Sequence, residues 1–503
     1  MVLGVSCLGK FVVCFEKNYI LYILDVLLTI NQKIFMNDQI GLKNGFEKRL
    51  DIVAKNIINN EKCSIPGFVV LAKRGEHTYH KAFGFSDKEK NIPMKLDSQF
   101  RCFSMTKVFA STIALILKEE GLIDLEATVG SYIPSFDKNF EVIINSANCE
   151  NEVMEIPYTS FMTGKTTNLS YCKKVAKNKM LVKHCLAESA GVGYDMWTDF
   201  DLAFQQPIFG HQYGVAQALR RKNGIGYYTS NTIIGQNATL EEYCDAIAAA
   251  GYLVAEPGTF SYGLGALILG RIIEVVLEKE TGKFLRFSEI CNEKLFKPLK
   301  MNSAAFYLED GDPRISKVPQ LYGAVLNDKT QGLDVKPYNE CLPKLNSLPN
   351  TVTTDQYQGF RKCDSGDTGS CMIVSDYAKF YEMLLSGGYS EEGKRILTAN
   401  SIKELTHGEF LDLDRHSKLA QAFGLTGETA SFNYGWALEK KTSTTPHCNQ
   451  WSGYANNHGR LYIEDNAYIL IFPQFMASTP AGFPIGDPVI KEPLVKAFLS
   501  EWI

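Results

Sequence analysis

The sequence predicts an α+β fold in which an antiparallel sheet is flanked by helices. Strand patterns lie near both ends of the chain, whereas helical patterns fill its middle. Strands from the two ends can pair in one sheet, which the helices then cover. The same order predicts an inserted, mainly helical subdomain with long loops, at roughly residues 109–360.

The first coherent folding signals come after residue 40. In the stretch FEKRLDIVAKNIINN, which begins at Phe46, apolar residues recur at helical spacing and predict an amphipathic helix. An apolar strand over 68–73, a turn at 74–76 and a strand through Phe83 predict a hairpin. The stretch VFASTIALILKEEGLI predicts a buried helix that ends near Gly121.

The middle of the chain predicts further helices in TLEEYCDAIAAAGYL, YGLGALILGRIIEVVLEKETG and SDYAKFYEMLLSGG. We expect Ser375 and Asp376 to cap the start of the third helix. Residues 140–180 are polar and have no steady period, so they predict an insertion or a long loop. Near the C-terminus, strands joined by a tight turn at 464–466 precede a closing helix with Asp487 as its N-cap.

Composition limits the partners and the compartment that we expect. The formal net charge is −4 and no long basic run occurs, so the sequence predicts no nucleic-acid partner. The 13 cysteines are scattered without a Cys-x-x-Cys pair, which is typical of free thiols in a reducing compartment. Neither the cysteines nor the eight histidines show a metal-binding motif. We therefore expect a cytoplasmic protein without a metal, and leave a secreted or organellar location open.

Residues 1–36 predict a loosely attached N-terminal extension that precedes one large domain over 37–503. The apolar run 19–30 is interrupted by Asp25 and is shorter than the roughly 20 residues that an ordinary membrane span needs. We therefore expect no stable membrane span. A signal peptide is not indicated either, because a basic start and a clear cleavage site are missing.

A candidate nucleophile lies in the stretch FRCFSMTKVFA, residues 100–110. Ser104 and Lys107 are three residues apart, so on a helix they share one face. A lysine in apolar surroundings releases its proton more readily and can then activate a serine. The alternative is a helix-capping serine beside a lysine that reaches solvent. The same pattern recurs at Ser170 and Lys173, so by itself it is not specific.

The context of this motif resembles the serine beta-lactamase and penicillin-binding-protein superfamily. The stretch GEHTYHKAFGFSDKEKNIPMKLDSQFRCFSMTKVFASTIALILKEEGLIDLEATVGSYIPSF carries the resemblance. It is most similar to the branch with class C beta-lactamases, D-alanyl-D-alanine carboxypeptidases, family VIII esterases and transesterases. Further landmarks are LVKHCLAESAGVGYD, EPGTFSYGLGALILGRIIEVV, SCMIVSDYAKFYEMLLSGG and WSGYANNHGRLYIEDNAYILIF. The resemblance implies a beta-lactamase-like fold from about residue 46 onward, with Ser104 as the nucleophile.

The resemblance also implies a catalytic tyrosine. The family often places Tyr-x-Asn beside its serine, and the matching residue is Tyr262 in GTFSYGLGA. A phenol next to a lysine ammonium loses its proton more readily, so Tyr262 is expected to take the Ser104 proton and return it to the leaving group. Leu264 stands where the family often has asparagine. That change removes an amide suited to the acylamido group of a beta-lactam.

The third family element is a strand that faces the serine, with Lys-Thr-Gly, His-x-Gly or Trp-x-Gly. Its match is Trp451-Ser452-Gly453, followed by Tyr454. By analogy, the backbone N–H groups of Ser104 and Tyr454 are expected to bind the oxyanion. His458 begins an alternative element, but WSG leaves the following hairpin in the family's position. Trp451 replaces a cation suited to a substrate carboxylate.

These observations predict a serine hydrolase or acyltransferase that forms an acyl-enzyme on small esters or amides. Trp451 and Leu264 favour an esterase or transesterase over a beta-lactamase. The first alternative is a beta-lactamase or D-Ala-D-Ala carboxypeptidase. The second is a non-catalytic scaffold or self-assembling protein of the same fold. The expected partner is a small acyl substrate, no cofactor is implied, and the oligomeric state is left open.

Overall fold

The computed structural model describes most of the chain from Gly45 onward. The described residues are 45–60, 64–150, 152–159, 166–194, 211–222, 238–327, 332–341, 363–408, 410–412, 430–442, 446–476 and 487–500. The expected extension 1–36 lies outside them. Among the described helices, none combines the length and the apolar character needed to cross a membrane.

A nine-stranded antiparallel sheet joins the two ends of the described chain, as the sequence predicts. Strands β1 (Gly67–Arg74) and β17 (Ala467–Pro473) pair at its centre, with Phe68 opposite Pro473. In sheet order the strands are β12 (Leu411–Asp412), β13 (Ala430–Phe432), β14 (Ala437–Glu439), β15 (Cys448–Ser452), β16 (His458–Tyr462), β17, β1, β2 (His77–Asp87) and β3 (Ile92–Pro93).

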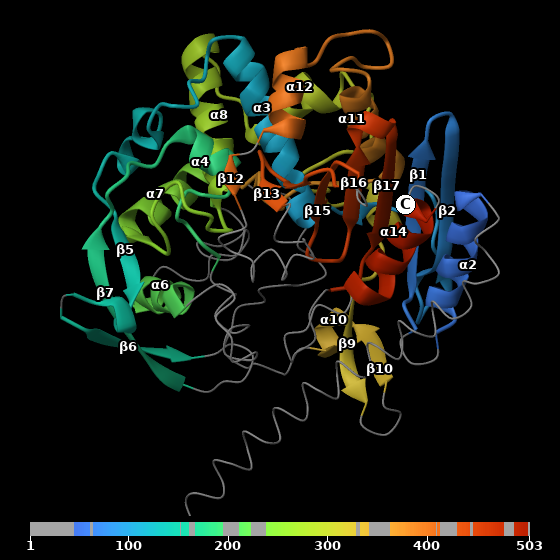
Figure 1. Cartoon of the computed structure of the whole chain (residues 1–503), viewed down its shortest axis with the longest axis horizontal. Coiled ribbons are helices and arrows are strands. Elements are labelled where there is room, and N and C mark those ends of the chain that lie inside the picture. Colours follow the sequence, from blue (N-terminus) through green and yellow to red (C-terminus); the bar gives the residue numbers. More distant parts are fainter. Residues whose placement is uncertain are drawn as a thin grey trace, which may run out of the picture.

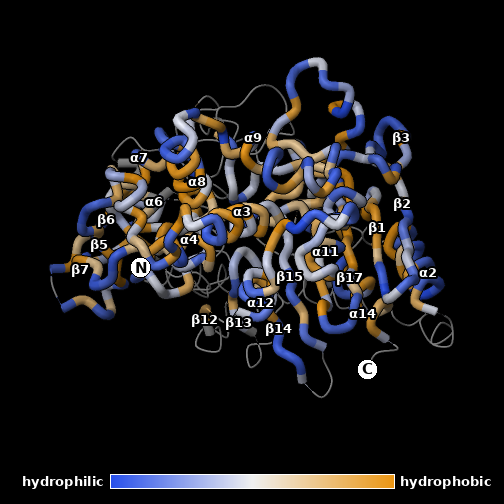
Figure 2. The backbone as a smooth tube through the Cα atoms, turned by 90° about the horizontal axis from the view of Figure 1, so that it is seen from above, coloured by the Kyte–Doolittle hydropathy of each residue, from blue (hydrophilic) through white to orange (hydrophobic). Residues whose placement is uncertain are grey.

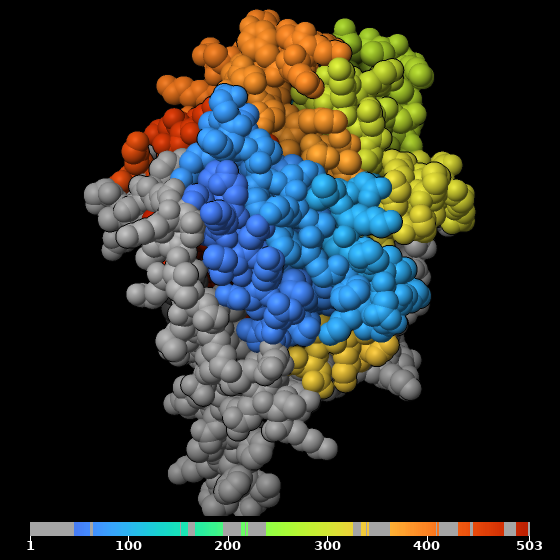
Figure 3. All heavy atoms as spheres, turned by 90° about the vertical axis from the view of Figure 1, so that its right-hand side faces the viewer, coloured from blue at the N-terminus to red at the C-terminus, as the bar shows by residue number. Residues whose placement is uncertain are grey.

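Helices bury both faces of this sheet (Figure 1). On one face, α2 (Phe46–Ile58) and α14 (Glu492–Leu499) pack together, and the rings of Phe46 and Phe498 meet edge to face. On the other face lie α3 (Lys107–Glu119) and α11 (Val374–Leu385). Because side chains alternate along a strand, β1 supplies apolar residues to both cores. In Figure 3, residues of the first described part of the chain (blue) adjoin residues from its last third (orange and red).

The helix α3 runs through the hydrophobic centre of the molecule (Figure 2). All of its residues from Lys107 to Leu117 are buried, and α8 (Gly265–Thr281) packs beside it. The remaining α-helices are α4 (Val182–Leu186), α6 (His211–Lys222), α7 (Leu240–Ala250), α9 (Phe287–Cys291), α10 (Tyr338–Cys341) and α12 (Ala399–His407). The described residues also form three small sheets: β4 (Phe100–Arg101) with β11 (Cys371–Met372), β9 (Tyr322–Asn327) with β10 (Gly332–Pro337), and one that holds β5 to β8.

The polar region 140–180 is not a long loop. It forms β5 (Glu141–Asn145), β6 (Met154–Thr159) and β7 (Thr166–Val175), which join β8 (Tyr252–Leu253) in a four-stranded sheet. Polar residues on the exposed positions of β7 hide the strand alternation in the sequence. Within this sheet region, Cys149 and Cys172 form a disulfide, which departs from the expectation of free thiols. The eight other cysteines in the described part of the chain are free and buried, as expected.

The structure corrects two predicted helix starts. Helix α11 begins at Val374 with Ile373 as its N-cap, so Ser375 and Asp376 lie inside its first turn. The carboxylate of Asp376 instead accepts hydrogen bonds from the backbone and hydroxyl of Ser303. Asp487 begins a π-helical turn, and α14 starts only at Glu492. The other predicted helices and the hairpin turn at 464–466 are confirmed.

Candidate functional site

Ser104 lies in a tight turn directly before the central helix. Residues Phe103–Thr106 form a short 3-10 helix that leads into α3. The backbone of Phe103 has φ +48°, a left-handed conformation that bulky residues rarely adopt and that often marks functional sites. The hydroxyl of Thr106 donates to the Phe103 carbonyl at 2.6 Å and lies 2.8 Å from Ser370 Oγ. These contacts fix the turn, and Ser104 retains 8% exposure.

Lys107 is the first residue of α3 and is completely buried. Its amine donates hydrogen bonds to the hydroxyl of Tyr194 at 2.8 Å and to the backbone carbonyl of Asp367 at 3.2 Å. The nitrogen also lies 4.8 Å from the ring centroid of Tyr262 and 5.2 Å from that of Tyr194. The predicted alternative, a lysine that reaches solvent, does not fit this burial.

Tyr262 lies just before the N-terminus of α8, and its hydroxyl contacts the other candidate side chains. Its hydroxyl has hydrogen-bonding interactions with the side chains of Ser104 and Lys107. The indole N–H of Trp451, at the end of β15, donates to the same hydroxyl at 3.3 Å. Three of the side chains that the sequence singles out, Ser104, Lys107 and Trp451, therefore converge on the phenol oxygen of a fourth, Tyr262.

The end of β15 runs directly past the nucleophile turn. A Cβ on Gly453 would come 2.4 Å from the carbonyl oxygen of Cys102, so only glycine allows this close approach. The ring of Tyr454 packs edge to face on Phe103 at 6.3 Å. The hydroxyl of Ser452 lies 2.8 Å from Nδ1 of His458, on the neighbouring strand. Successive strand residues point to opposite faces, so Ser452 is turned away from the cluster around Tyr262.

Buried charges set the protonation of the site. Burial alone lowers the pKa of Lys107, but the negative charges of Tyr262, Glu188 and Asp367 raise its pKa overall. The surroundings of the amine are therefore ionic rather than apolar, and they do not ease loss of its proton as the sequence analysis expected. Burial raises the pKa of Glu188 to about 7, although Lys107 opposes this shift. Burial likewise raises the pKa of Tyr262, and the Lys107 charge lowers it.

Sequence reasoning missed three residues of this site, namely Tyr194, Glu188 and Asp367. All three are almost fully buried, and Tyr194 donates a 2.5 Å hydrogen bond to Oδ2 of Asp367. Glu188 Oε2 accepts from the backbone N–H of Gly263, next to Tyr262. The landmark LVKHCLAESAGVGYD contains two of them, so its presence was a usable signal. Asp367 had no local signal, because nothing near it in the sequence resembles a motif.

An aromatic group borders the cluster on the side of Trp451. The ring of Phe432 meets Trp451 edge to face at 5.1 Å, and Phe260 lies 5.2 Å from Phe432. Leu264, which stands where the family often has asparagine, is fully buried in the hydrophobic core. The surroundings of Trp451 are therefore apolar.

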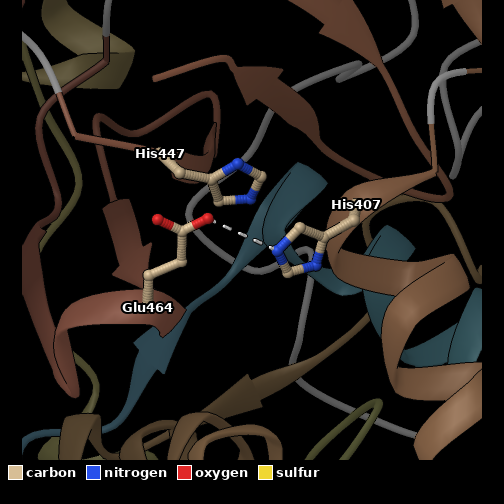
Figure 4. Close-up of side chains that lie close together, drawn as sticks. All are labelled: His407, His447 and Glu464. Atoms are coloured by element: carbon tan, nitrogen blue, oxygen red, sulfur yellow. Dashed lines mark ion pairs between the residues drawn. The ribbon is translucent and has the colours of Figure 1, made fainter. Parts of the chain in front are cut away.

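A second group of polar side chains could in principle hold a metal. His407, His447 and Glu464 offer ligand atoms within 4.8 Å of one another (Figure 4). However, the carbonyl oxygen of Thr406 lies 3.0 Å from His447 Nε2, and Lys441 pairs with Glu464 at 3.3 Å. A cation would have to displace the lysine and compete with the carbonyl contact, so we assign no metal to this group.

Comparisons with known proteins show which family and which folds the chain is similar to. The family model described as Beta-lactamase matches residues 53–483. Penicillin-binding protein 4* of Bacillus subtilis is 28% identical over 424 residues, which cover 82% of this chain and 69% of that protein. The hydrolase EstCE1, described as having promiscuous acyltransferase activity, has a TM-score of 0.62 at 19% identity and covers 90% of this chain and 98% of its own. Simvastatin synthase (LovD) of Aspergillus terreus has a TM-score of 0.61 at 17% identity over 91% of this chain and 98% of its own.

Proposed function

Because this chain belongs to the Beta-lactamase family of serine hydrolases, we propose that it forms an acyl-enzyme at Ser104 on small esters or amides. The observation that carries the proposal is the convergence of Ser104, Lys107 and Trp451 on the Tyr262 hydroxyl. A serine is a useful nucleophile only when a base lies within hydrogen-bonding reach. This cluster meets that requirement inside a largely buried site.

In the proposed first step, Ser104 Oγ attacks the carbonyl carbon of the substrate. The hydroxyl proton passes to the oxygen of Tyr262 in its phenolate form, which the charge of Lys107 favours, as the new C–O bond forms. The carbonyl becomes an oxyanion, which accepts hydrogen bonds from the backbone N–H groups of Ser104 and Tyr454. The contact between Gly453 and the nucleophile turn supports this arrangement, because it holds the strand edge beside Ser104.

In the proposed second step, the oxyanion collapses and the bond to the leaving group breaks. Tyr262 returns the proton to the leaving alcohol or amine, which leaves Ser104 acylated. Water or an alcohol then attacks the acyl carbonyl and loses its proton to Tyr262. Tyr262 passes this proton to Ser104 Oγ as the bond between Ser104 and the acyl group breaks. Water gives hydrolysis and an alcohol gives acyl transfer. None of these steps uses a metal or an organic cofactor.

We further propose that esters with apolar acyl groups are better substrates than beta-lactams. The indole N–H of Trp451 is engaged by Tyr262, so the side chain offers a substrate chiefly its apolar ring. Phe432 packs edge to face against that ring and Phe260 packs against Phe432, so the buried surroundings of the ring are aromatic as well. Beta-lactams and D-alanine peptides carry a carboxylate that an arginine or lysine would recognise. EstCE1 and LovD are described as a hydrolase and a synthase. Their likeness in fold supports the proposal that this chain acts on esters.

Covalent labelling with a fluorophosphonate tests the nucleophile. We expect the full-length protein to be labelled, and the modified peptide to contain Ser104. Ser104→Ala should abolish labelling. The matched control is Ser170→Ala, because Ser170 belongs to the second Ser-x-x-Lys pattern but lies on β7. Equal labelling of Ser104→Ala and the unaltered protein would reject the assignment.

A substrate panel tests the preference. We expect p-nitrophenyl esters to be hydrolysed with a higher kcat/KM than a chromogenic cephalosporin, and the ratio to grow with acyl chain length. A cephalosporin that is turned over as well as the best ester would favour the beta-lactamase alternative. A chain that hydrolyses neither substrate class and takes no label would favour the scaffold alternative.

A further inference from the structure

Tyr194 connects the amine of the site to a buried carboxylate. Its hydroxyl carries one hydrogen, which it donates to Oδ2 of Asp367 at 2.5 Å. The same oxygen lies 2.8 Å from Nζ of Lys107 and accepts a hydrogen bond from it. Because the only hydroxyl hydrogen points to Asp367, Tyr194 can offer Lys107 nothing but a lone pair. Asp367 therefore fixes the direction of the contact between Tyr194 and Lys107.

This contact limits what the amine of Lys107 can do. A lysine nitrogen has three positions besides its bond to carbon. Two of them are hydrogens donated to Tyr194 and to the backbone carbonyl of Asp367. The third position remains for Tyr262, which is the remaining hydrogen-bonding neighbour of the nitrogen. This third position holds a proton when the amine is charged and a lone pair when the amine is neutral. In both states it points toward Tyr262.

We propose that Tyr194 and Asp367 are positioning residues, which hold the Lys107 amine so that its third position faces Tyr262, the hydrogen-bonding partner of Ser104. The inference deepens the proposed function and rests on it. Neither residue touches the reacting atoms. Both act through Lys107, one by accepting from its amine and the other by orienting the acceptor.

Asp367 also changes the charge around the amine. The ionisable groups that face Lys107 are Tyr262 before α8, Glu188 and Tyr194 after α4, and Asp367 before β11. Asp367 is completely buried, so its charge acts on the amine with little screening by water. A neutral amide at this position should keep the hydrogen-bonded arrangement and remove the charge. Orientation and charge can therefore be tested separately.

The chain offers a matched control for each substitution. Tyr79 donates a 2.8 Å hydrogen bond to Oδ1 of Asp51, and Lys81 lies 5.1 Å from the Tyr79 ring centroid. These residues join β2 to α2, and Tyr79 belongs to the opposite core from Tyr194. Tyr79→Phe and Asp51→Asn therefore remove the same chemical groups from a similar cluster without touching Lys107.

The test uses the full chain with Tyr194→Phe, Asp367→Asn and the two control variants. For each, the rate of Ser104 labelling by a fluorophosphonate is measured against pH, kcat and KM are measured with p-nitrophenyl acetate, and the unfolding temperature is recorded. For Tyr194→Phe we expect labelling and kcat to fall about 100-fold with little change in KM, because a Lys107 amine that is no longer oriented should lose the lower end of what general acid–base catalysis supplies. For Asp367→Asn we expect the apparent pKa that Lys107 contributes to the profile of labelling rate against pH to fall by at least about one unit. Both control variants should keep the unaltered rate and profile.

The outcomes separate this inference from the proposed function. If the unaltered protein takes no label at Ser104, both proposals fail. If it is labelled and a folded Tyr194→Phe matches Tyr79→Phe in rate and profile, only the positioning role fails. If Tyr194→Phe does not fold, Asp367→Asn decides, and an unshifted pH profile overturns the inference.

Discussion

Among the residues that the structure describes, lysine, tyrosine and aspartate meet both at the surface and in the buried site, with different results. At the surface, Asp51 accepts from both Lys81 and Tyr79, so the two charges touch directly. In the site, Tyr194 lies between Lys107 and the side chain of Asp367. The side chain of Lys81 is 49% exposed, whereas Lys107 is completely buried.

The comparison shows how burial changes the role of a charge. For Asp51, burial raises the pKa, but the hydrogen bonds from Lys81 and Tyr79 outweigh it and the pKa falls overall. For Asp367, burial dominates and the pKa rises despite Lys107. A screened surface pair contributes little to stability, and a buried charge is costly to leave unpaired. The surface group therefore contributes a little to stability by joining β2 to α2. The buried group instead constrains the protonation and orientation of its lysine.

The largest contrast is expected when each lysine is replaced by methionine. Lys107→Met leaves Asp367 and Glu188 buried without their cation, which should lower the free energy of unfolding by about 3–5 kcal/mol. Ser104 labelling of the folded protein should fall by about 10³-fold. Lys81→Met should cost less than about 1 kcal/mol and leave labelling unchanged. Chemical denaturation and labelling measure both, and equal stability losses would break the comparison.

The next contrast concerns two glycines that each approach a backbone carbonyl. A Cβ on Gly453 would lie 2.4 Å from Cys102 O, and one on Gly67 would lie 2.5 Å from Phe85 O. Both alanine variants should lose stability by similar amounts. Only Gly453→Ala should also slow acylation, by about 100-fold, because it shifts the strand edge beside Ser104. Labelling per folded molecule is the measurement, and a parallel loss in Gly67→Ala would contradict this role of Gly453.

Two carboxylates should give the protein opposite pH dependences of stability. Burial raises the pKa of Glu188 from 4.5 to about 7, so the folded state holds its proton more tightly than the unfolded state. Stability contributed by the protonated group is complete below pH 4.5 and is lost as the pH rises through about 7, with a total of about 3 kcal/mol. Glu188→Gln keeps an acceptor for Gly263 N–H and should remove this loss.

For Asp51 the sign is reversed. Its folded pKa is lowered below 3.8, so its stabilisation is present above that pH and is lost as the pH falls through the folded value. Denaturation at several pH values measures both effects. If Glu188→Gln gains no stability over the unaltered protein between acidic and neutral pH, the raised pKa of Glu188 is wrong.

The smallest effect is expected at Trp451. Trp451→Phe keeps an aromatic ring beside Phe432 but removes the N–H that donates to Tyr262 at 3.3 Å. One neutral hydrogen bond of this kind is worth roughly a threefold to tenfold change in rate. The change should appear in kcat for p-nitrophenyl esters, with the preference for apolar acyl groups retained. A loss beyond about 100-fold would mean that Trp451 does more than orient the phenol.

Two Ser-x-x-Lys patterns show what the sequence could and could not predict about the site. Ser104 lies in the 3-10 turn before the central helix and Lys107 is the first residue of that helix, so three-residue spacing places both side chains toward Tyr262. Ser170 and Lys173 lie on β7, where the same spacing sends them to opposite faces, and Lys173 pairs with Glu141 at 2.9 Å. The apolar helix after Ser104 and the family resemblance distinguished the first pattern in advance. The Ser-x-x-Lys pattern alone could not distinguish Ser104 from Ser170.

The sequence by itself determined the sheet built from the two chain ends, most of the helices and the common direction of Ser104 and Lys107, because these depend on local periodicity and short spacing. Only the tertiary structure decided the charge and orientation of the Lys107 amine. Its two fixed partners, Tyr194 and Asp367, lie 87 and 260 residues away in the chain. Electrostatic and hydrogen-bonding effects depend on distances in space, and for such remote residues those distances exist only once the chain has folded.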